Sequence, residues 1–143
     1  MAFRATLMVT LGAALACAGP HAAAERTSGV VRITAPPKEY RSGPSVYGTV
    51  SVTFEPDMAR MKKELCPSFA FSVGVLMGCV NINEGRGCAI VLWSGLKRAP
   101  ALRAAVEEHE WAHCRGWGSD HAGGRERVFN VGRGFFPPPP TEY

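Results

Sequence analysis

The sequence predicts a small α+β domain in which a short, mostly antiparallel sheet packs against one helix. Three observations support this fold class. The chain has 143 residues, which is enough for one domain. Short β-rich runs separated by Gly, Pro and Asn lie in the middle of the chain, and one run rich in Ala, Leu, Arg and Glu follows them. Strands that gather before a helix, instead of alternating with helices, are typical of the α+β class.

The composition indicates a folded chain, since 46% of the residues are hydrophobic and 20% are charged. The only long apolar run lies at the amino terminus and is too short to span a bilayer. No internal repeat is visible. The formal net charge of +4 is scattered along the chain, so we expect no nucleic-acid partner. These features exclude multi-pass membrane proteins, multidomain enzymes and solenoids.

Residues 1–24 have the layout of a secretory signal peptide. Arg4 supplies the positive charge, Leu7–Ala16 is apolar, and the alanines at 22–24 match the small residues before a signal-peptidase cleavage site. A lipoprotein signal acylated at Cys17 is the alternative. We therefore expect an exported protein, periplasmic or secreted, with no stable membrane insertion after cleavage. The oligomeric state is left open.

The cysteine content predicts two disulfides. Cleavage after residue 24 removes Cys17 from the five cysteines of the chain. An even number of cysteines in an exported protein indicates disulfides, and four allow three pairings, among which the sequence does not choose. No C-x-x-C is present, which argues against a four-cysteine zinc site or a thioredoxin-type motif. The remaining cysteines are Cys66, Cys79, Cys88 and Cys114.

Alternating or β-branched runs bounded by turn residues predict four short strands. The third could instead be a buried helix, and as a strand it would form a hairpin with the fourth. The alternation of the second strand places Val46, Val50 and Phe54 on one half-buried face. The expected strands are Val30–Thr34, Val46–Phe54, Phe69–Val80 and Cys88–Trp93.

Two helices are expected. The first is short, Met58–Leu65, and its charged residues form a solvated face. The second runs from Ala101 to His113, with a proline in its first turn and Gly116 as its stop signal. We place the domain at residues 25–134, followed by a proline-rich tail at 135–143 that favours an extended polyproline conformation.

The second helix carries the motif H-E-x-x-H over residues 109–113. On a helix, residues i and i+4 face the same side, so His109 and His113 can bind one zinc ion. In this motif the glutamate, here Glu110, takes a proton from the metal-bound water instead of binding the metal. His121 lies close behind, so that all histidines after the leader fall within thirteen residues. The alternative is a pair of surface histidines with a third in a loop.

These residues resemble a known group of enzymes. The sequence His109-Glu110-x-x-His113-x-x-Gly116 is similar to the opening of the metzincin pattern of the zincin metallopeptidases. The stretch continues as Cys114-x-Gly116-Trp117-x-x-Asp120-His121 and resembles small exported bacterial zincin-like metallopeptidases over residues 109–121. The resemblance implies a zincin-like domain that hydrolyses peptide bonds, with Zn²⁺ as cofactor, Glu110 as catalytic base and a peptide or protein as substrate.

The third metal ligand departs from the metzincin pattern. That pattern would place it at Ser119, which is a poor zinc ligand. We favour His121, because neutral imidazole is a common zinc ligand. We expect Asp120 to orient a histidine without binding the metal itself. The reversed assignment, with Asp120 as third ligand, is the alternative.

Three further points stay open. In zincins a peptide pairs with the edge of the strand before the active helix, and Cys88–Trp93 is either such an edge or an ordinary core strand. No oxyanion donor stands out among Tyr47, Arg125 and Tyr143. The alternative to an enzyme is a non-catalytic exported envelope protein that binds a partner or is stabilised by zinc. Such a structural zinc site needs four ligands, which would be His109, His113, Asp120 and His121.

Overall fold

The computed structural model describes residues 29–67, 76–83 and 85–136. The predicted signal peptide at 1–24 and the last seven residues of the predicted tail lie outside the described residues, as do residues 69–75 of the third predicted strand. Within the described residues, no helix is both long and apolar enough to cross a membrane.

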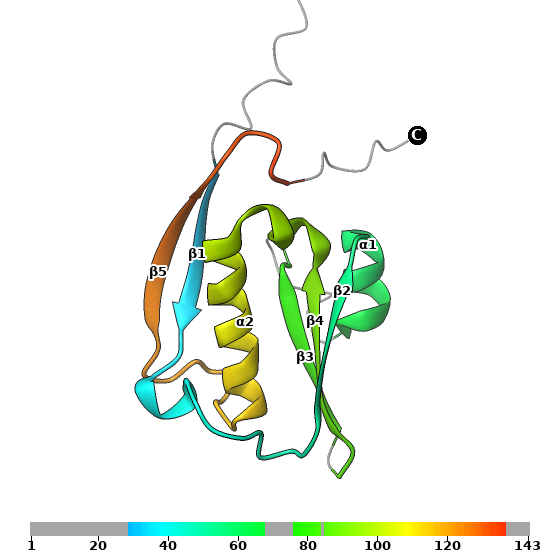
Figure 1. The fold of residues 1–143 in the computed structure, drawn as a ribbon, viewed down its shortest axis with the longest axis vertical. Helices are drawn as coiled ribbons and strands as arrows, with labels where there is room; N and C mark the ends of the chain where they lie inside the picture. The colour runs from blue at the N-terminus through cyan, green and yellow to red at the C-terminus, as the bar shows by residue number, and fades with distance from the viewer. Residues whose placement is uncertain (1–28, 68–75, 84, 137–143) are drawn as a thin grey trace, which may run out of the picture.

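The helix α2 (Pro100–Cys114) packs against two separate small sheets, one to either side of it in Figure 1. The first sheet is the antiparallel pair β1 (Gly29–Ala35) and β5 (Arg125–Val131). The second has the order β2-β4-β3. The structure confirms a small α+β fold with mostly antiparallel pairing. The expectation of a single sheet was wrong, because β1 pairs with β5 and not with the other strands.

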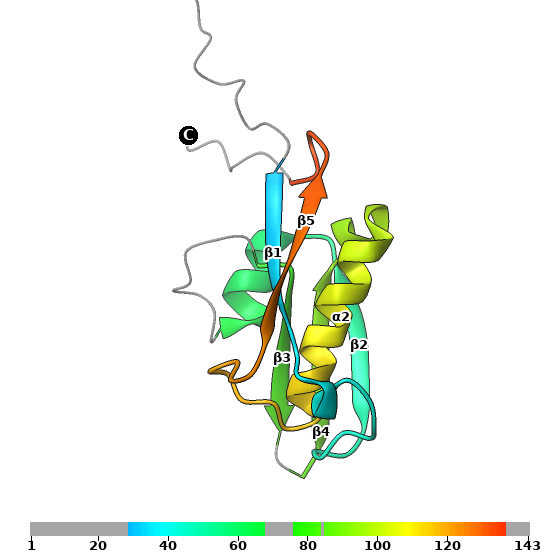
Figure 2. The same ribbon diagram turned by 90° about the vertical axis from the view of Figure 1, so that its left-hand side faces the viewer.

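In the second sheet, β2 (Val50–Glu55) is parallel to β4 (Gly87–Trp93), and β3 (Gly78–Asn83) is antiparallel to β4. The predicted hairpin is confirmed over its described part. β4 lies between the other two strands, so the hypothesis that it offers a free edge was wrong. The strand at the edge beside α2 is β3 (Figures 1 and 2).

The second strand begins later than predicted, at Val50 instead of Val46. Val46 is 66% exposed, and its N–H donates to the carbonyl of Cys114 at the end of α2 over 3.0 Å. Gly48 then adopts a φ of 96°, a left-handed conformation that breaks an extended strand. The apolar alternation before Val50 therefore belongs to a loop that is tied to the helix.

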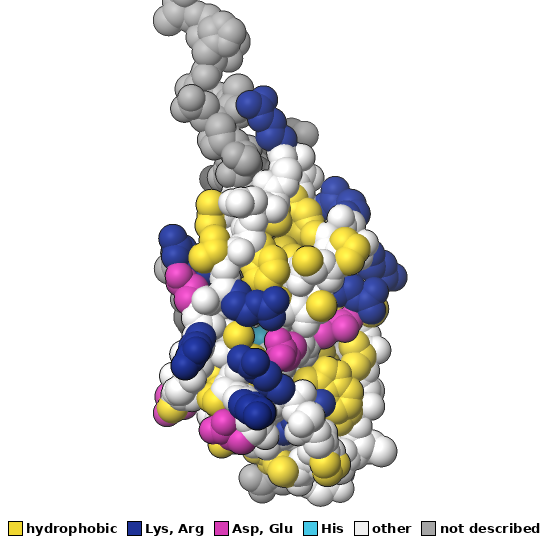
Figure 3. All heavy atoms as spheres, turned by 60° about the vertical axis from the view of Figure 1, so that its left-hand side comes forward, with side chains coloured by type: hydrophobic (Ala, Val, Ile, Leu, Met, Phe, Trp, Pro, Cys, Tyr) yellow, Lys and Arg dark blue, Asp and Glu magenta, His cyan; other side chains and the backbone are white. Residues whose placement is uncertain are grey.

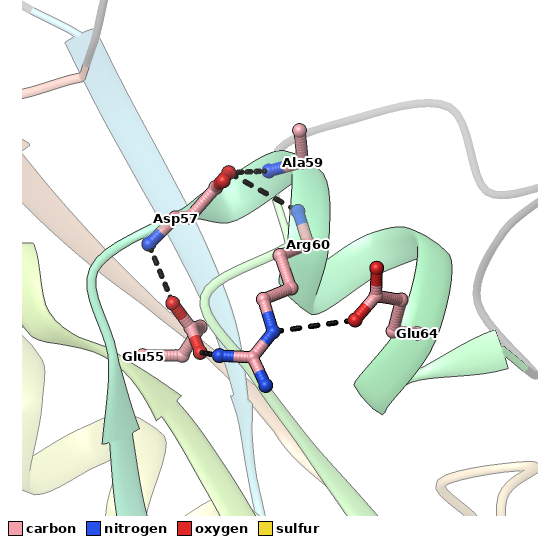
Figure 4. Close-up of polar contacts among 5 residues, drawn as sticks. All are labelled: Glu55, Asp57, Ala59, Arg60 and Glu64. Carbon is pink, nitrogen blue, oxygen red and sulfur yellow. Dashed lines mark hydrogen bonds and ion pairs between the residues drawn. The ribbon is translucent and has the colours of Figure 1, made fainter.

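The predicted helix over Met58–Leu65 is present as α1 (Met58–Arg60) and a wider π-type turn, η2 (Met61–Leu65). Its start is fixed by the Asp57 carboxylate, which accepts from the N–H groups of Ala59 and Arg60 over 2.8 and 3.1 Å (Figure 4). The charged residues here form more than a solvated face, because the buried Glu55 carboxylate pairs with Arg60 over 3.0 Å.

Two disulfides join the elements, as the cysteine count predicts. Cys66–Cys79 ties the end of η2 to β3, and Cys88–Cys114 ties β4 to the last residue of α2. All four cysteines are buried. Two buried disulfides indicate that the chain matures in an oxidising environment.

The helix α2 begins with Pro100 in its first turn and ends at Cys114, as predicted. Gly116 has a φ of 94°, which suits a residue that ends a helix. Short helical turns occupy Lys38–Tyr40 and Ser94–Arg98. The core lies between α2 and the sheets, and its fully buried side chains include Met61, Ile90, Leu92, Leu96 and Leu102.

The strand β5 was not predicted, and neither was the packing that follows it. Phe135 is 8% exposed and meets the ring of Trp93 edge-on at 5.3 Å, while Phe136 stacks on the same ring at 6.0 Å. The carbonyl of Phe135 accepts from Arg98 over 2.6 Å. The packed part of the chain therefore reaches Phe136, and the first two residues of the predicted tail belong to the core.

Candidate metal centre

Three histidines meet at the C-terminal end of α2. His109 and His113 lie one turn apart on the helix, and His121 lies on the loop that follows. Gly116 reverses the chain, and His121 itself has a φ of 54°, rare for a residue with a side chain. The turn is closed by bonds from the N–H of His121 to Gly118 and from the N–H of Gly124 to His121. This loop brings the third imidazole back to the helix.

The imidazole nitrogens are spaced as one metal ion requires. The Nε2 atoms of His109 and His113 are 3.2 Å apart, and those of His121 and His113 are also 3.2 Å apart. Two nitrogens bound to one tetrahedral zinc ion at 2.0–2.1 Å lie about 3.3 Å from each other. The three side chains could therefore hold a metal ion with little rearrangement.

The other ring nitrogens fix the tautomers of the two helical histidines. Nδ1 of His109 donates to the carbonyl of Thr34 over 2.6 Å, and Nδ1 of His113 donates to that of Trp117 over 2.8 Å. Each Nε2 is then left with a lone pair. Burial lowers the pKa of His109 to about 4 and also lowers the pKa of His113. Both rings are therefore neutral at physiological pH, the state in which imidazole binds metals.

The neighbouring candidates do not join this cluster. The carboxylate of Asp120 accepts from the N–H of Ala122 over 3.2 Å and so supports the turn that carries His121. Ser119 lines the cleft beside the cluster without being part of it. Among the described residues, the third nitrogen of the group comes from His121.

Glu110 lies beside the first histidine and points toward β3. Its side chain is 6% exposed, and a Cβ atom built on Gly78 would lie 2.8 Å from its Oε1. Within the described residues no hydrogen bond to its carboxylate is present, and neither oxygen is a fully buried atom without a partner, so the cleft gives access to them. Burial raises the pKa of Glu110 to about 8. The residue is thus a buried carboxyl group that is free to exchange a proton with whatever occupies the site.

A cleft of about 560 Å³ opens onto the three histidines and Glu110. Its walls come from β1, from residues 76–82 on and before β3, from α2 and from the loop at 116–121. Most of the side chains around the polar centre are apolar. They are Ile33, Tyr47, Leu76, Met77, Val80, Ile82, Val106 and Trp117.

The three candidate oxyanion donors have different locations. Tyr47 lines the cleft, whereas Arg125 lines a separate hollow with Lys38 and Arg41. Tyr143 lies outside the described residues.

On the face that carries β1 and β5, only a small area of histidine side chain is visible between Lys, Arg, Asp and Glu side chains (Figure 3). The histidines are therefore largely covered from that side.

Three supporting features were not predicted from the sequence. The carbonyls of Thr34 and Trp117 orient the helical histidines, and Gly78 makes room for Glu110. Trp117 lies within the motif at residues 109–121, so the sequence offered a local reason to place it near the histidines. No pattern in the sequence connects residue 34 or residue 78 with the helix.

No protein-family model, no curated protein and no solved structure matches this chain.

Proposed function

We propose that this chain is an exported zinc-dependent peptidase. One observation carries the proposal: three imidazole nitrogens converge at the end of a cleft, beside a buried carboxylate that has no partner among the described residues. The zincin resemblance of residues 109–121 agrees with this arrangement.

The residues present suit zinc. His109, His113 and His121 would hold it through neutral nitrogen ligands, a common donor set for catalytic zinc. Zinc held there supplies a Lewis acid that polarises the scissile carbonyl and makes water more acidic. The carbonyls of Thr34 and Trp117 hold two of the rings in the orientation that binding needs.

Glu110 would move the protons. Its carboxylate accepts a proton from the attacking water and then passes one to the leaving amine. Burial raises the pKa of Glu110 to about 8, and a positive ion bound by the neighbouring histidines would lower it. The carboxyl group is then suited to both accepting and donating a proton near neutral pH.

An extended peptide would pair with the edge of β3. The N–H of Trp93 donates to the carbonyl of Met77 over 2.8 Å, which places Met77 and every second residue after it toward β4. The backbone groups of Gly78, Val80 and Ile82 therefore point away from β4, and these residues line the cleft. An open strand edge can bind a peptide by β-augmentation.

The number of ligands favours catalysis over a purely structural role. A structural zinc site is usually closed by four protein ligands, whereas a catalytic site has three and keeps one position open. The cluster contains three ligand atoms within the described residues, and the carboxylate of Asp120 is bound to the backbone nearby. The leader-like layout of residues 1–24 and the two disulfides support export.

The test combines zinc content with peptide hydrolysis for three proteins: the unmodified mature chain, Glu110→Gln and Glu107→Gln. Glu107 lies on the same helix, where it pairs with Arg103 over 2.8 Å, and it does not line the cleft, so it is a matched control. We expect one zinc ion in all three, and hydrolysis to fall by orders of magnitude only in Glu110→Gln. Zinc without hydrolysis of a broad peptide library would support the non-catalytic alternative. Absence of zinc would refute the site.

A further inference from the structure

Trp117 contacts every histidine of the cluster. Its ring centroid lies 5.2 Å from that of His109, 5.2 Å from that of His113 and 4.9 Å from that of His121. It stacks on His113 with an interplanar angle of 18°. Trp117 is 4% exposed, so the indole forms an inner wall of the site.

Hydrogen bonds of Trp117 join the helix to the loop that follows. Its N–H donates to the carbonyl of Ala112 over 3.0 Å, and its carbonyl accepts from His113. At the far end of the side chain, the indole Nε1 donates to the carbonyl of Ala122 over 3.0 Å. Ala122 directly follows His121, so the indole spans the distance from the end of α2 to the third histidine.

Of the three histidines, His121 needs this support most. His109 and His113 lie on a helix, and each has a carbonyl partner for its Nδ1. His121 lies on a loop, and within the described residues its ring has no such carbonyl partner. Its φ of 54° is a conformation that a residue with a side chain rarely adopts without restraint. The bond from Trp117 to Ala122 restrains the neighbouring peptide.

We infer that Trp117 is the positioning residue for the third metal ligand, because its indole N–H holds the backbone beside His121 in the conformation that directs the imidazole toward the other two. The inference rests on the proposed metal centre and does not depend on peptide hydrolysis.

The test is a double-mutant cycle on zinc affinity, measured by competition with a chelating dye. Trp117→Phe keeps an aromatic ring and removes the N–H donor, and Trp111→Phe, whose ring lies outside the cleft, is the matched control. We expect Trp117→Phe to weaken zinc binding about 10- to 100-fold and Trp111→Phe to leave it unchanged. The loss should persist on a His109→Ala background and vanish on a His121→Ala background.

The possible results separate this inference from the metal centre itself. Zinc binding by the unmodified chain with no loss in Trp117→Phe, or an equal loss on both histidine backgrounds, would overturn the role of Trp117. No zinc binding by the unmodified chain would overturn the metal centre and this inference with it. If Trp117→Phe does not fold, hydrogen exchange of the Trp117 indole N–H in the unmodified protein decides. We expect slow exchange, and exchange as fast as in a free indole would refute the bond.

Discussion

The substitution Gly78→Ala should lower the proposed peptidase activity about 100-fold without replacing a metal ligand. A Cβ at this position would lie 2.8 Å from Oε1 and 3.1 Å from Cγ of Glu110. It would also lie 2.9 Å from Cγ1 of Val106, which is buried in the core and β-branched, so it cannot easily turn aside. The added methyl group must therefore displace the carboxylate, the strand or both.

The size of both effects follows from this crowding. Overpacking of a filled site costs about 1–3 kcal/mol of folding free energy. A displacement of about 1 Å at a reacting group can lower the rate about 100-fold, which corresponds to about 2.7 kcal/mol. Zinc content should not change, because the three atoms nearest to the added Cβ belong to Glu110 and Val106 and not to a histidine. We expect a modestly destabilised protein that binds zinc and hydrolyses peptides about 100-fold more slowly.

The assay compares urea unfolding, zinc content and hydrolysis for Gly78→Ala and Gly132→Ala. A Cβ at Gly132 would meet no atom within 4 Å, so the control makes the same chemical change in open space. Gly132→Ala should behave like the unmodified chain. A Gly78→Ala protein with full activity and full stability would show that Glu110 is not packed against β3 as described.

Three further predictions concern the metal and its support. His121→Ala should weaken zinc binding by more than about 100-fold, because it removes a ligand. Asp120→Ala should leave zinc binding nearly unchanged and lower the free energy of unfolding by about 1 kcal/mol, because it removes one hydrogen bond to the backbone. Equal zinc affinities in the two variants would contradict the choice of His121. A chelator should lower the melting temperature measured by calorimetry. Zinc present at about 1,000 times its Kd stabilises the folded state by about 4 kcal/mol, and its removal loses that contribution. An unchanged melting temperature would argue against a bound metal. Replacing both Cys88 and Cys114 by Ala should destabilise the chain by about 3.5 kcal/mol in urea unfolding, because the bridge closes a separation of 26 residues, and a loss below about 1 kcal/mol would refute the estimate.

The features set by neighbouring residues could be predicted from the sequence. The helix Pro100–Cys114 has a proline in its first turn, helix-forming residues throughout and a glycine just beyond its end, so local preferences agree along its length. The pairing of two histidines on one helix face follows from the helical repeat alone. The hairpin of β3 and β4 is likewise a local structure, because its two strands are close neighbours in the chain.

The features set by distant residues could not be predicted. β5 has four exposed residues at its start, Arg125 to Val128, so it lacks the alternation that marks a half-buried strand. Its extended form depends on pairing with β1, nearly a hundred residues earlier. The same is true of Thr34, whose carbonyl reaches His109 only because β1 lies beside α2. The apolar alternation at Val46 wrongly predicted the start of a strand there, because a hydrogen bond to the carbonyl of Cys114 holds Val46 in a loop.

The pairing of the first described strand with the last one has a consequence for the order of folding. Gly29 lies opposite Val131, so β1 has no partner strand until almost the whole chain has emerged. A contact between such distant residues forms late, because a long loop must close first. The carbonyl of Thr34, which orients His109, reaches that position only when β1 packs beside α2. A nascent chain would therefore carry an incomplete histidine cluster, and the hydrolysis proposed above would begin only after β5 had joined the fold.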